Sequence, residues 1–142
     1  MGVKFFGRYE HSLDPKGRVI LPAKFRSHFD AGGFLTSYWE GCLALWTPGE
    51  FDKQMTSMEE AQEQGRPERN LARVWAAGTQ DVEIDKQGRL FIAPSLRVFA
   101  GLDTGVLVHG ALNRIELWSP ERWEAKLATT ERILIDEHDE VA

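Results

Sequence analysis

Short stretches of alternating hydrophobic and polar residues recur along the chain, and this period of two is typical of strands with one buried face. The alternation is clear at residues 9–13 and 82–84, and a second strand is expected after the turn that follows each, at 18–21 and 89–92. Further hairpins are expected from 34–39 with 43–46 and from 105–109 with 114–118. The pattern therefore predicts a chain built mainly from short strands.

Helices are expected between and after these strands, where apolar residues recur every three or four positions. Short helices are predicted at 22–29 and 94–99. Thr47 and Ser119 each precede a proline, which is typical of the capped start of a longer helix, and a linking helix is predicted to end at Gly78. The side chains expected to face the core from the longer helices are Phe51, Met55, Met58, Leu71, Val74, Trp75, Trp123 and Leu127. The acidic residues 136–140 are expected to fray.

The two halves of the chain repeat one another. The stretch LDPKGRVIL at 13–21 returns as IDKQGRLFI at 84–92, an offset of 71 residues, and LWTP at 45–48 returns as LWSP at 117–120, an offset of 72. Two matching blocks in the same order, with rare Trp and Pro residues in common, indicate a tandem duplication. The predicted organisation is a first repeat at 8–50, a helical linker at 51–78, a second repeat at 79–123, and a C-terminal helix and acidic tail at 124–142.

Neither repeat is expected to form a core alone, because about 45 residues in short strands bury too little apolar surface. Packing the two repeats about a pseudo-twofold axis would solve this problem and would place their turns equivalently. Trp46 and Trp118, which match between the repeats, are expected to pack in a core rather than to stack on bases. The predicted fold class is α+β, rich in β structure, with peripheral helices.

Composition and charge narrow the classes of partner. The chain has 142 residues, of which 42% are hydrophobic and 27% charged, as is typical of a globular protein. No apolar run approaches the roughly 18 residues of a membrane helix, so no membrane partner is expected. The net charge is −5, yet residues 1–26 carry +4 and the remainder −9. A local basic surface of this size can still attract phosphate.

The turn of each repeat contains the candidate ligand-binding residues. In the first repeat, Asp, Pro and Gly occupy the first, second and fourth positions, which are type I preferences with a Gly free to take a positive φ. Arg18 follows at once, and its planar guanidinium suits phosphate oxygens or guanine O6 and N7. Asp14 and Asp85 are expected to staple the turns, whereas Arg18, beside Lys16, is expected to contact DNA. The candidate DNA-binding residues are Arg8, Lys16, Arg18, Lys86 and Arg89, on turns defined by Asp14, Gly17, Asp85 and Gly88.

Signatures of an enzyme or a metal site are missing from the sequence. The histidines at 11, 28, 109 and 138 show no paired metal spacing, and there is no nucleophile elbow, Walker loop or dinucleotide-binding motif. The single cysteine, Cys42, cannot form an internal disulfide, which fits a reducing cytoplasm, and is expected to be a small buried residue. No catalytic residue, metal or cofactor is predicted.

The motifs of both repeats resemble the MraZ family. The resemblance is carried by YEHSLDPKGR at 9–18, PAKFR at 22–26, DKQGR at 85–89 and RIELW at 114–118, and it extends from about Phe5 to Glu124. It implies two tandem AbrB-like half-domains of the swapped-hairpin type in a closed ring of subunits. It also implies a bacterial transcriptional regulator, in the cytoplasm and nucleoid, that binds short tandem repeats of double-stranded DNA upstream of the division and cell-wall gene cluster.

Within this resemblance, the Asp-x-x-x-Arg motif is the DNA-contacting element, which assigns that role to residues 14–18 and 85–89. The sequence departs from the pattern in two ways. Pro15 stiffens the first turn, and Gln87 stands where the first repeat has Lys16, so the second turn is less basic. The competing hypothesis is a ring-forming protein-interaction scaffold whose acidic outer helices recruit partners and whose DNA binding is incidental.

Overall fold

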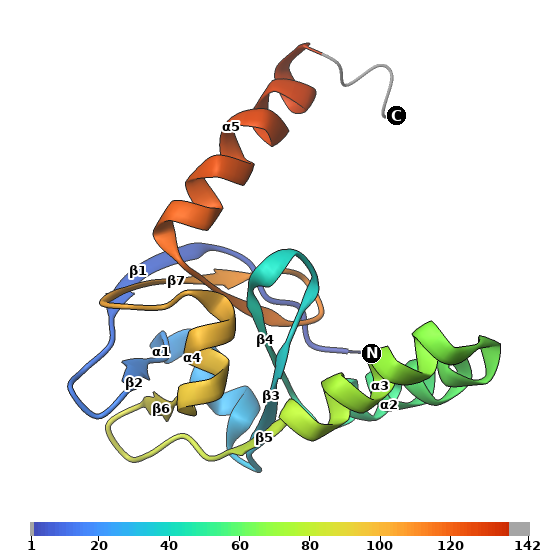
Figure 1. Ribbon diagram of the computed structural model, residues 1–142. Helices are drawn as coiled ribbons and strands as arrows, with labels where there is room; N and C mark the ends of the chain where they lie inside the picture. The colour runs from blue at the N-terminus through green and yellow to red at the C-terminus, as the bar shows by residue number, and fades with distance from the viewer. Residues whose placement is uncertain (1, 137–142) are drawn as a thin grey trace.

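The structure is a computed structural model that describes residues 2–136 (Figure 1). The strands are β1 (Arg8–Ser12), β2 (Arg18–Ile20), β3 (Gly33–Ser37), β4 (Leu43–Trp46), β5 (Gln80–Val82), β6 (Arg89–Phe91), β7 (Gly105–Gly110) and β8 (Ile115–Trp118). The α-helices are α1 (Ala23–Arg26), α2 (Pro48–Ala61), α3 (Arg66–Gly78), α4 (Pro94–Ala100) and α5 (Pro120–Asp136). Short 3₁₀ helices are η1 (Ser27–Phe29), η2 (Trp39–Gly41) and η3 (Gln62–Gln64). The predicted α+β class is confirmed. Within residues 2–136, no helix has the length and apolar character needed to cross a bilayer.

The strands form two antiparallel sheets that exchange strands between the repeats. One sheet has the order β1-β7-β8-β4-β3-β5, and the other is a two-stranded ribbon of β2 and β6. The predicted hairpins β3–β4 and β7–β8 are confirmed. The prediction that the two strands flanking each Asp turn pair with each other is wrong. Instead β1 pairs with β7 and β5 with β3, while β2 and β6 pair with each other. Pairing across the repeats places Val19 opposite Leu90, and both side chains are buried.

The pairing between the repeats is symmetric. In the ribbon, Val19 lies opposite Leu90 and the pairs on either side exchange places under the offset of 71. In the larger sheet, Ala44 of β4 lies opposite Glu116 of β8, and the neighbouring pairs exchange under the offset of 72. A pseudo-twofold axis therefore passes through both ladders, as expected for two repeats packed around a common axis.

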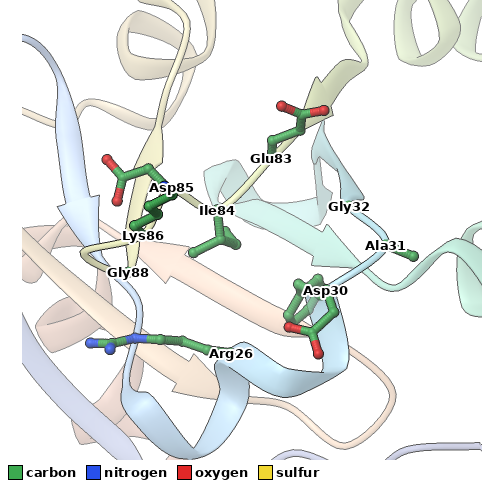
Figure 2. A pocket seen from close by; sticks show the side chains of 10 residues that line it. Arg26, Asp30, Ala31, Gly32, Glu83, Ile84, Asp85, Lys86 and Gly88 are labelled. Atoms are coloured by element: carbon green, nitrogen blue, oxygen red, sulfur yellow. The ribbon is translucent and has the colours of Figure 1, made fainter.

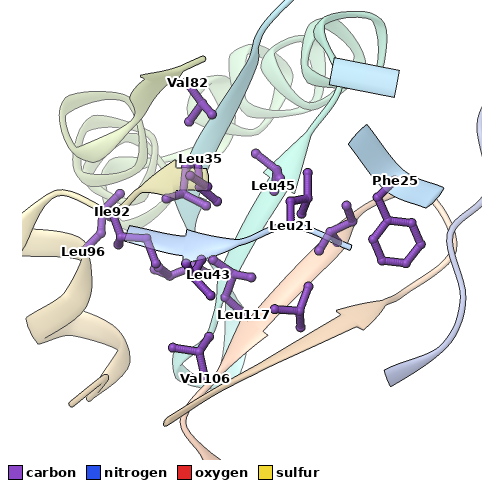
Figure 3. Close-up of a cluster of buried hydrophobic side chains, with 14 of the residues drawn as sticks. Leu21, Phe25, Leu35, Leu43, Leu45, Val82, Ile92, Leu96, Val106 and Leu117 are labelled. Atoms are coloured by element: carbon purple, nitrogen blue, oxygen red, sulfur yellow. The ribbon is translucent and has the colours of Figure 1, made fainter. Parts of the chain in front are cut away.

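The main core draws equivalent side chains from both repeats. Figure 3 shows Leu21 and Ile92, which follow the ribbon strands, in one cluster with Phe25, Leu96 and several leucines of the larger sheet. Each fully buried side chain of this size stabilises the fold by about 1.5–3 kcal/mol. Because the cluster draws its buried residues from both halves of the chain, we expect that neither repeat would keep this core without the other.

The two repeat-matched tryptophans are buried, as predicted, but their indole N–H groups are satisfied differently. Trp46 donates to the buried Thr36 hydroxyl at 3.0 Å. Trp118 donates to Glu116 Oε1 at 2.8 Å, and Oε2 of the same carboxylate accepts from Arg114. A carboxylate that is only 8% exposed is therefore paired with a cation and a donor beside the pseudo-twofold axis.

The helix pair α2–α3 packs on one end of the larger sheet. Thr47 caps α2 by accepting the N–H of Glu50 at 3.3 Å, as predicted. Phe51 stacks between Phe34, at 4.1 Å between ring centroids, and Trp75, at 5.3 Å. The linking helix ends at Gly78, also as predicted.

Three side chains expected in the core of this helix pair are exposed instead. The exposed fractions are 39% for Met55, 39% for Leu71 and 67% for Val74. On α3, only the face that carries Ala72 and Trp75 is buried. The apolar stripe of the α2–α3 pair is therefore wider than the face that the pair buries.

Helix α5 projects from the body of the molecule (Figure 1). Ser119 caps it by accepting the N–H of Arg122 at 3.3 Å, and Arg122 Nη1 in turn donates to the carbonyls of Gly41 and Phe99. Trp123 packs on Trp118, with 5.3 Å between ring centroids. Beyond this anchored first part the helix has no buried side chain. The tail expected to fray begins at Asp136, the last helical residue, and its other members lie outside the described residues.

Candidate nucleic-acid interface

Asp14 organises the first turn through both of its carboxylate oxygens. Oδ1 accepts from the backbone N–H groups of Lys16 and Arg18, each at 2.9 Å, and Oδ2 accepts from Nε of Arg18 at 2.7 Å. The pKa of Asp14 is lowered, chiefly by the bond from the Arg18 backbone N–H. The carboxylate is therefore ionised at neutral pH and holds the Arg18 guanidinium in one orientation.

The second turn has the same geometry. Asp85 accepts from the N–H groups of Gln87 and Arg89, each at 2.9 Å, and from Nε of Arg89 at 2.7 Å. Its pKa is also lowered, chiefly by the Arg89 backbone bond. One contact differs, because Nη2 of Arg89 donates to the Gln87 side-chain oxygen at 3.3 Å. Only Asp, Gly and Arg are shared by the two turns, so these three residue types suffice to build them.

Gly17 and Gly88 are required by backbone conformation, and each packs closely against an arginine side chain. Their φ values are 80° and 81°, in the left-handed region that favours glycine. A Cβ on Gly17 would lie 2.8 Å from Cζ of Arg97, and a Cβ on Gly88 would overlap the guanidinium of Arg26. Each turn is thus covered by an arginine from the other repeat. Arg26 and Arg97 are 71 residues apart, the offset of the repeat, but the sequence does not indicate that they exchange sides.

The ribbon brings the two turn arginines onto one face. Arg18 lies opposite Phe91, and Arg89 lies opposite Ile20. Because side chains alternate along a strand, these four share the outer face of the ribbon, while Val19 and Leu90 face the core. Arg18 and Arg89 are diagonal neighbours on that face, a relation with about 7–8 Å between Cα atoms. Both turns lie at the same edge of the molecule, away from α2 and α3 (Figure 1).

The terminal nitrogens of Arg18 remain available for a ligand. Its Nε is bound to Asp14, and Nη1 and Nη2 make no hydrogen bond to any residue in the range 2–136. The Arg18 side chain is 25% exposed, and that of Arg89 is 31% exposed. Lys16 and Lys86 are exposed on the two turns. The outer face therefore presents two planar donor groups flanked by two flexible cations.

Arg8, the fifth candidate, lies away from these groups. It is the first residue of β1 and pairs with His109, whereas the turn begins beyond the other end of that strand. Six residues of extended chain span about 20 Å. The structure brings Lys16, Arg18, Lys86 and Arg89 together, and it does not bring Arg8 to them.

A hollow of about 560 Å³ opens beside the second turn (Figure 2). Its charged lining includes Asp30, Glu83 and Asp85 against Arg26 and Lys86. Three carboxylates in one concave surface repel phosphate, so the hollow itself is a poor anion site. Arg26 and Lys86 can bind phosphate only where they reach the outer side of the turn.

The buried titratable groups indicate packing rather than catalysis. Burial raises the pKa of the Cys42 thiol, so it remains protonated. Burial also lowers the pKa of His109 to about 4, and its ring packs against Trp123 at 4.3 Å between centroids. Among residues 2–136, no three His, Cys, Asp or Glu side chains lie close enough to hold a metal ion. The burial of Cys42 was predicted and is confirmed.

The fold and the turns together define a duplicated β-ribbon protein, in which two strand-exchanging repeats present Asp-held arginines on one face. The chain belongs to the MraZ family. The family model described as "MraZ protein, putative antitoxin-like" matches it twice, over residues 5–74 and 75–142.

Bacterial relatives named "Transcriptional regulator MraZ" match most of the chain. The protein from Leifsonia xyli is 38% identical over 137 residues, which cover 96% of both chains. The protein from a Nocardioides species is 41% identical over 85% of this chain and 84% of its own. The protein from Lachnoclostridium phytofermentans is 40% identical over 85% of each. These relatives are named as regulators and not as enzymes.

Proposed function

We propose that this chain is a sequence-specific DNA-binding transcriptional regulator of the bacterial division and cell-wall gene cluster. The observation that carries the proposal is the pair of Asp-held arginines on the outer face of the β2–β6 ribbon. The names of the relatives support the regulatory role. The protein would then act on the chromosome, in the cytoplasm and nucleoid.

In this proposal the ribbon enters the major groove, which is wide enough for a two-stranded ribbon. Arg18 presents its two terminal nitrogens to guanine O6 and N7, and Asp14 fixes the guanidinium beforehand, which reduces the entropy lost on binding. Lys16 binds phosphate as a flexible point charge. Arg89 contributes less, because one of its terminal nitrogens already contacts Gln87.

The proposal includes assembly into a ring of more than two subunits. One subunit offers few phosphate contacts, and binding tandem DNA repeats side by side makes each further contact intramolecular. An apolar hollow of about 500 Å³ is lined by the exposed side chains of Trp39, Val74 and Phe99. The projecting end of α5 carries Leu134 and Ile135, which are 71% and 74% exposed. Seating the end of α5 in the hollow of the next subunit is a head-to-tail contact, which can close into a ring.

The same apolar hollow favours the second candidate, a ring-forming scaffold that binds other proteins. A gel shift at a fixed salt concentration separates the two functions. DNA from upstream of the division and cell-wall cluster should be retarded at a concentration at which the same DNA with scrambled repeats is not. Equal retardation of both DNAs, or of neither, would favour the scaffold. Light scattering at micromolar concentration should give a mass above that of a dimer, and a monomer would contradict the ring.

A further inference from the structure

Arg26 and Arg97 occupy equivalent positions and exchange turns between the repeats. Arg26 lies on α1 of the first repeat and covers Gly88, while Arg97 lies on α4 of the second repeat and covers Gly17. The cause is the antiparallel ribbon. The N–H of Leu21 donates to the Gly88 carbonyl at 2.8 Å and that of Ile92 donates to the Gly17 carbonyl at 2.9 Å, so each helix begins beside the other repeat's turn.

Neither guanidinium is neutralised by a carboxylate within residues 2–136. Nε of Arg26 donates to the Leu21 carbonyl at 2.7 Å, but Arg26 has no ion pair with any described residue. In the described part of the chain, Arg97 has neither an ion pair nor a hydrogen bond, and its Nε is buried without a partner there. Figure 2 shows the Arg26 guanidinium directed toward Gly88 and away from Asp30. Two arginines are thus fixed against the turns with their charge unpaired.

Each turn consequently gathers three cations around its aspartate, and at the second turn Asp30 and Glu83 also line the hollow beside Arg26 and Lys86. Arg97 joins Lys16 and Arg18 at the first turn. Arg26 joins Lys86 and Arg89 at the second, so both turns have three cations, although Gln87 stands where the first repeat has Lys16. Like charges held together raise the free energy of the unbound protein, and a phosphate between them removes that repulsion.

We propose that Arg97 and Arg26 bind phosphodiester groups of the DNA backbone, each completing the turn of the other repeat. The inference rests on the proposed DNA binding, to which it adds two phosphate-binding residues and their exchange between the repeats. A guanidinium offers two parallel donors to phosphate oxygens, which suits a residue that packs against the turn beside the base-reading arginine. The turn arginine reads bases, and the exchanged arginine anchors the backbone.

The test compares Arg97→Gln and Arg26→Gln with Arg73→Gln, which makes the same change in charge on the exposed face of α3, far from the turns. Glutamine keeps much of the stem that packs on the glycine. DNA affinity is measured over a range of salt concentrations, with thermal unfolding of each variant in parallel. We expect each turn variant to bind about tenfold more weakly, with a salt slope lower by about 0.9 for every subunit engaged, and the control to bind like the parent.

A double-mutant cycle tests the exchange itself. Arg97→Gln should be coupled to Arg18→Ala, at the same turn, and additive with Arg89→Ala. Coupling to Arg89 instead would overturn the assignment, and so would binding and a salt slope equal to those of Arg73→Gln. If Arg97→Gln does not fold, Arg97→Lys keeps the charge and should preserve the salt slope, and a reduced slope in the folded Lys variant would contradict the inference. Failure of the unmodified protein to bind DNA would instead refute the proposed function, and this inference with it.

Discussion

Replacing Arg18 by alanine separates the structural role of the Asp14 turn from its proposed role in DNA binding. The backbone N–H groups of residues 16 and 18 supply two of the three bonds to the carboxylate, and both remain in Arg18→Ala. The Gly17-to-Asp14 backbone bond is also independent of the side chain. The turn should therefore keep its shape, and the variant should unfold within a few degrees of the parent.

The expected loss of DNA affinity is large by comparison. A bidentate contact from arginine to guanine contributes roughly 1–3 kcal/mol of discrimination, and every 1.4 kcal/mol is about a factor of ten. With only two subunits engaged on neighbouring repeats, the lower figure already weakens binding by about thirtyfold. The loss should be confined to the specific DNA, because a base contact carries sequence information and a phosphate contact does not.

The assay is a titration of labelled upstream DNA and of scrambled DNA by the parent, by Arg18→Ala and by Arg89→Ala. Arg89→Ala should lose less, because its Nη2 is shared with Gln87. Parental binding by Arg18→Ala would show that the Asp14–Arg18 pair only staples the turn. Unfolding of Arg18→Ala under the same conditions would lead to the same conclusion. The scaffold hypothesis would then be the stronger one.

Three further outcomes follow from the structure. Lys16→Ala should weaken binding of specific and scrambled DNA equally and lower the salt slope by about 0.9 for every subunit engaged, measured by titration at several salt concentrations. Glu116→Ala should lower the free energy of unfolding by about 3 kcal/mol in urea, because it leaves the Arg114 cation and the Trp118 N–H without their partner. Burial holds the pKa of His109 at about 4 instead of 6.5, so unfolding takes up a proton between these values and stability falls as the pH is lowered through them. At about 1.4 kcal/mol per pH unit the loss is at most about 3 kcal/mol, and His109→Gln should remove that part of the pH dependence.

Features that depend on neighbouring residues were predictable from the sequence. Asp, Gly and Arg at fixed spacing specify the two turns, because every bond that builds them lies within four residues. The β3–β4 and β7–β8 hairpins and the Thr47 cap are local in the same sense. The internal repeat was also visible, and it predicted the pseudo-twofold relation.

Features that depend on the other repeat were not predictable in this way. Alternation marks the strands on either side of each turn but does not name their partners, and a local hairpin is the simplest expectation. The structure pairs β1 with β7 and β2 with β6 instead. The contacts of Arg97 with Gly17 and of Arg26 with Gly88 are consequences of that exchange. An apolar stripe likewise shows which residues favour burial, not whether this chain covers them, and Leu71 and Val74 remain exposed.

Because the repeats exchange strands, the outer face of the β2–β6 ribbon, which carries Arg18 and Arg89, is formed by both repeats together and not by either one alone. Arg18 and Arg89 are held on one face by three residue pairs of the β2–β6 ladder, whose other face is sealed by Val19 and Leu90. Shifting the ladder by one residue would turn the arginines inward and the leucine and valine outward, so the hydrophobic core fixes the register of the DNA-reading groups. The spacing between the two arginines is therefore set by the ladder, because each arginine is the first residue of a ribbon strand. A single repeat would lose the ladder, the shared core and the second arginine together.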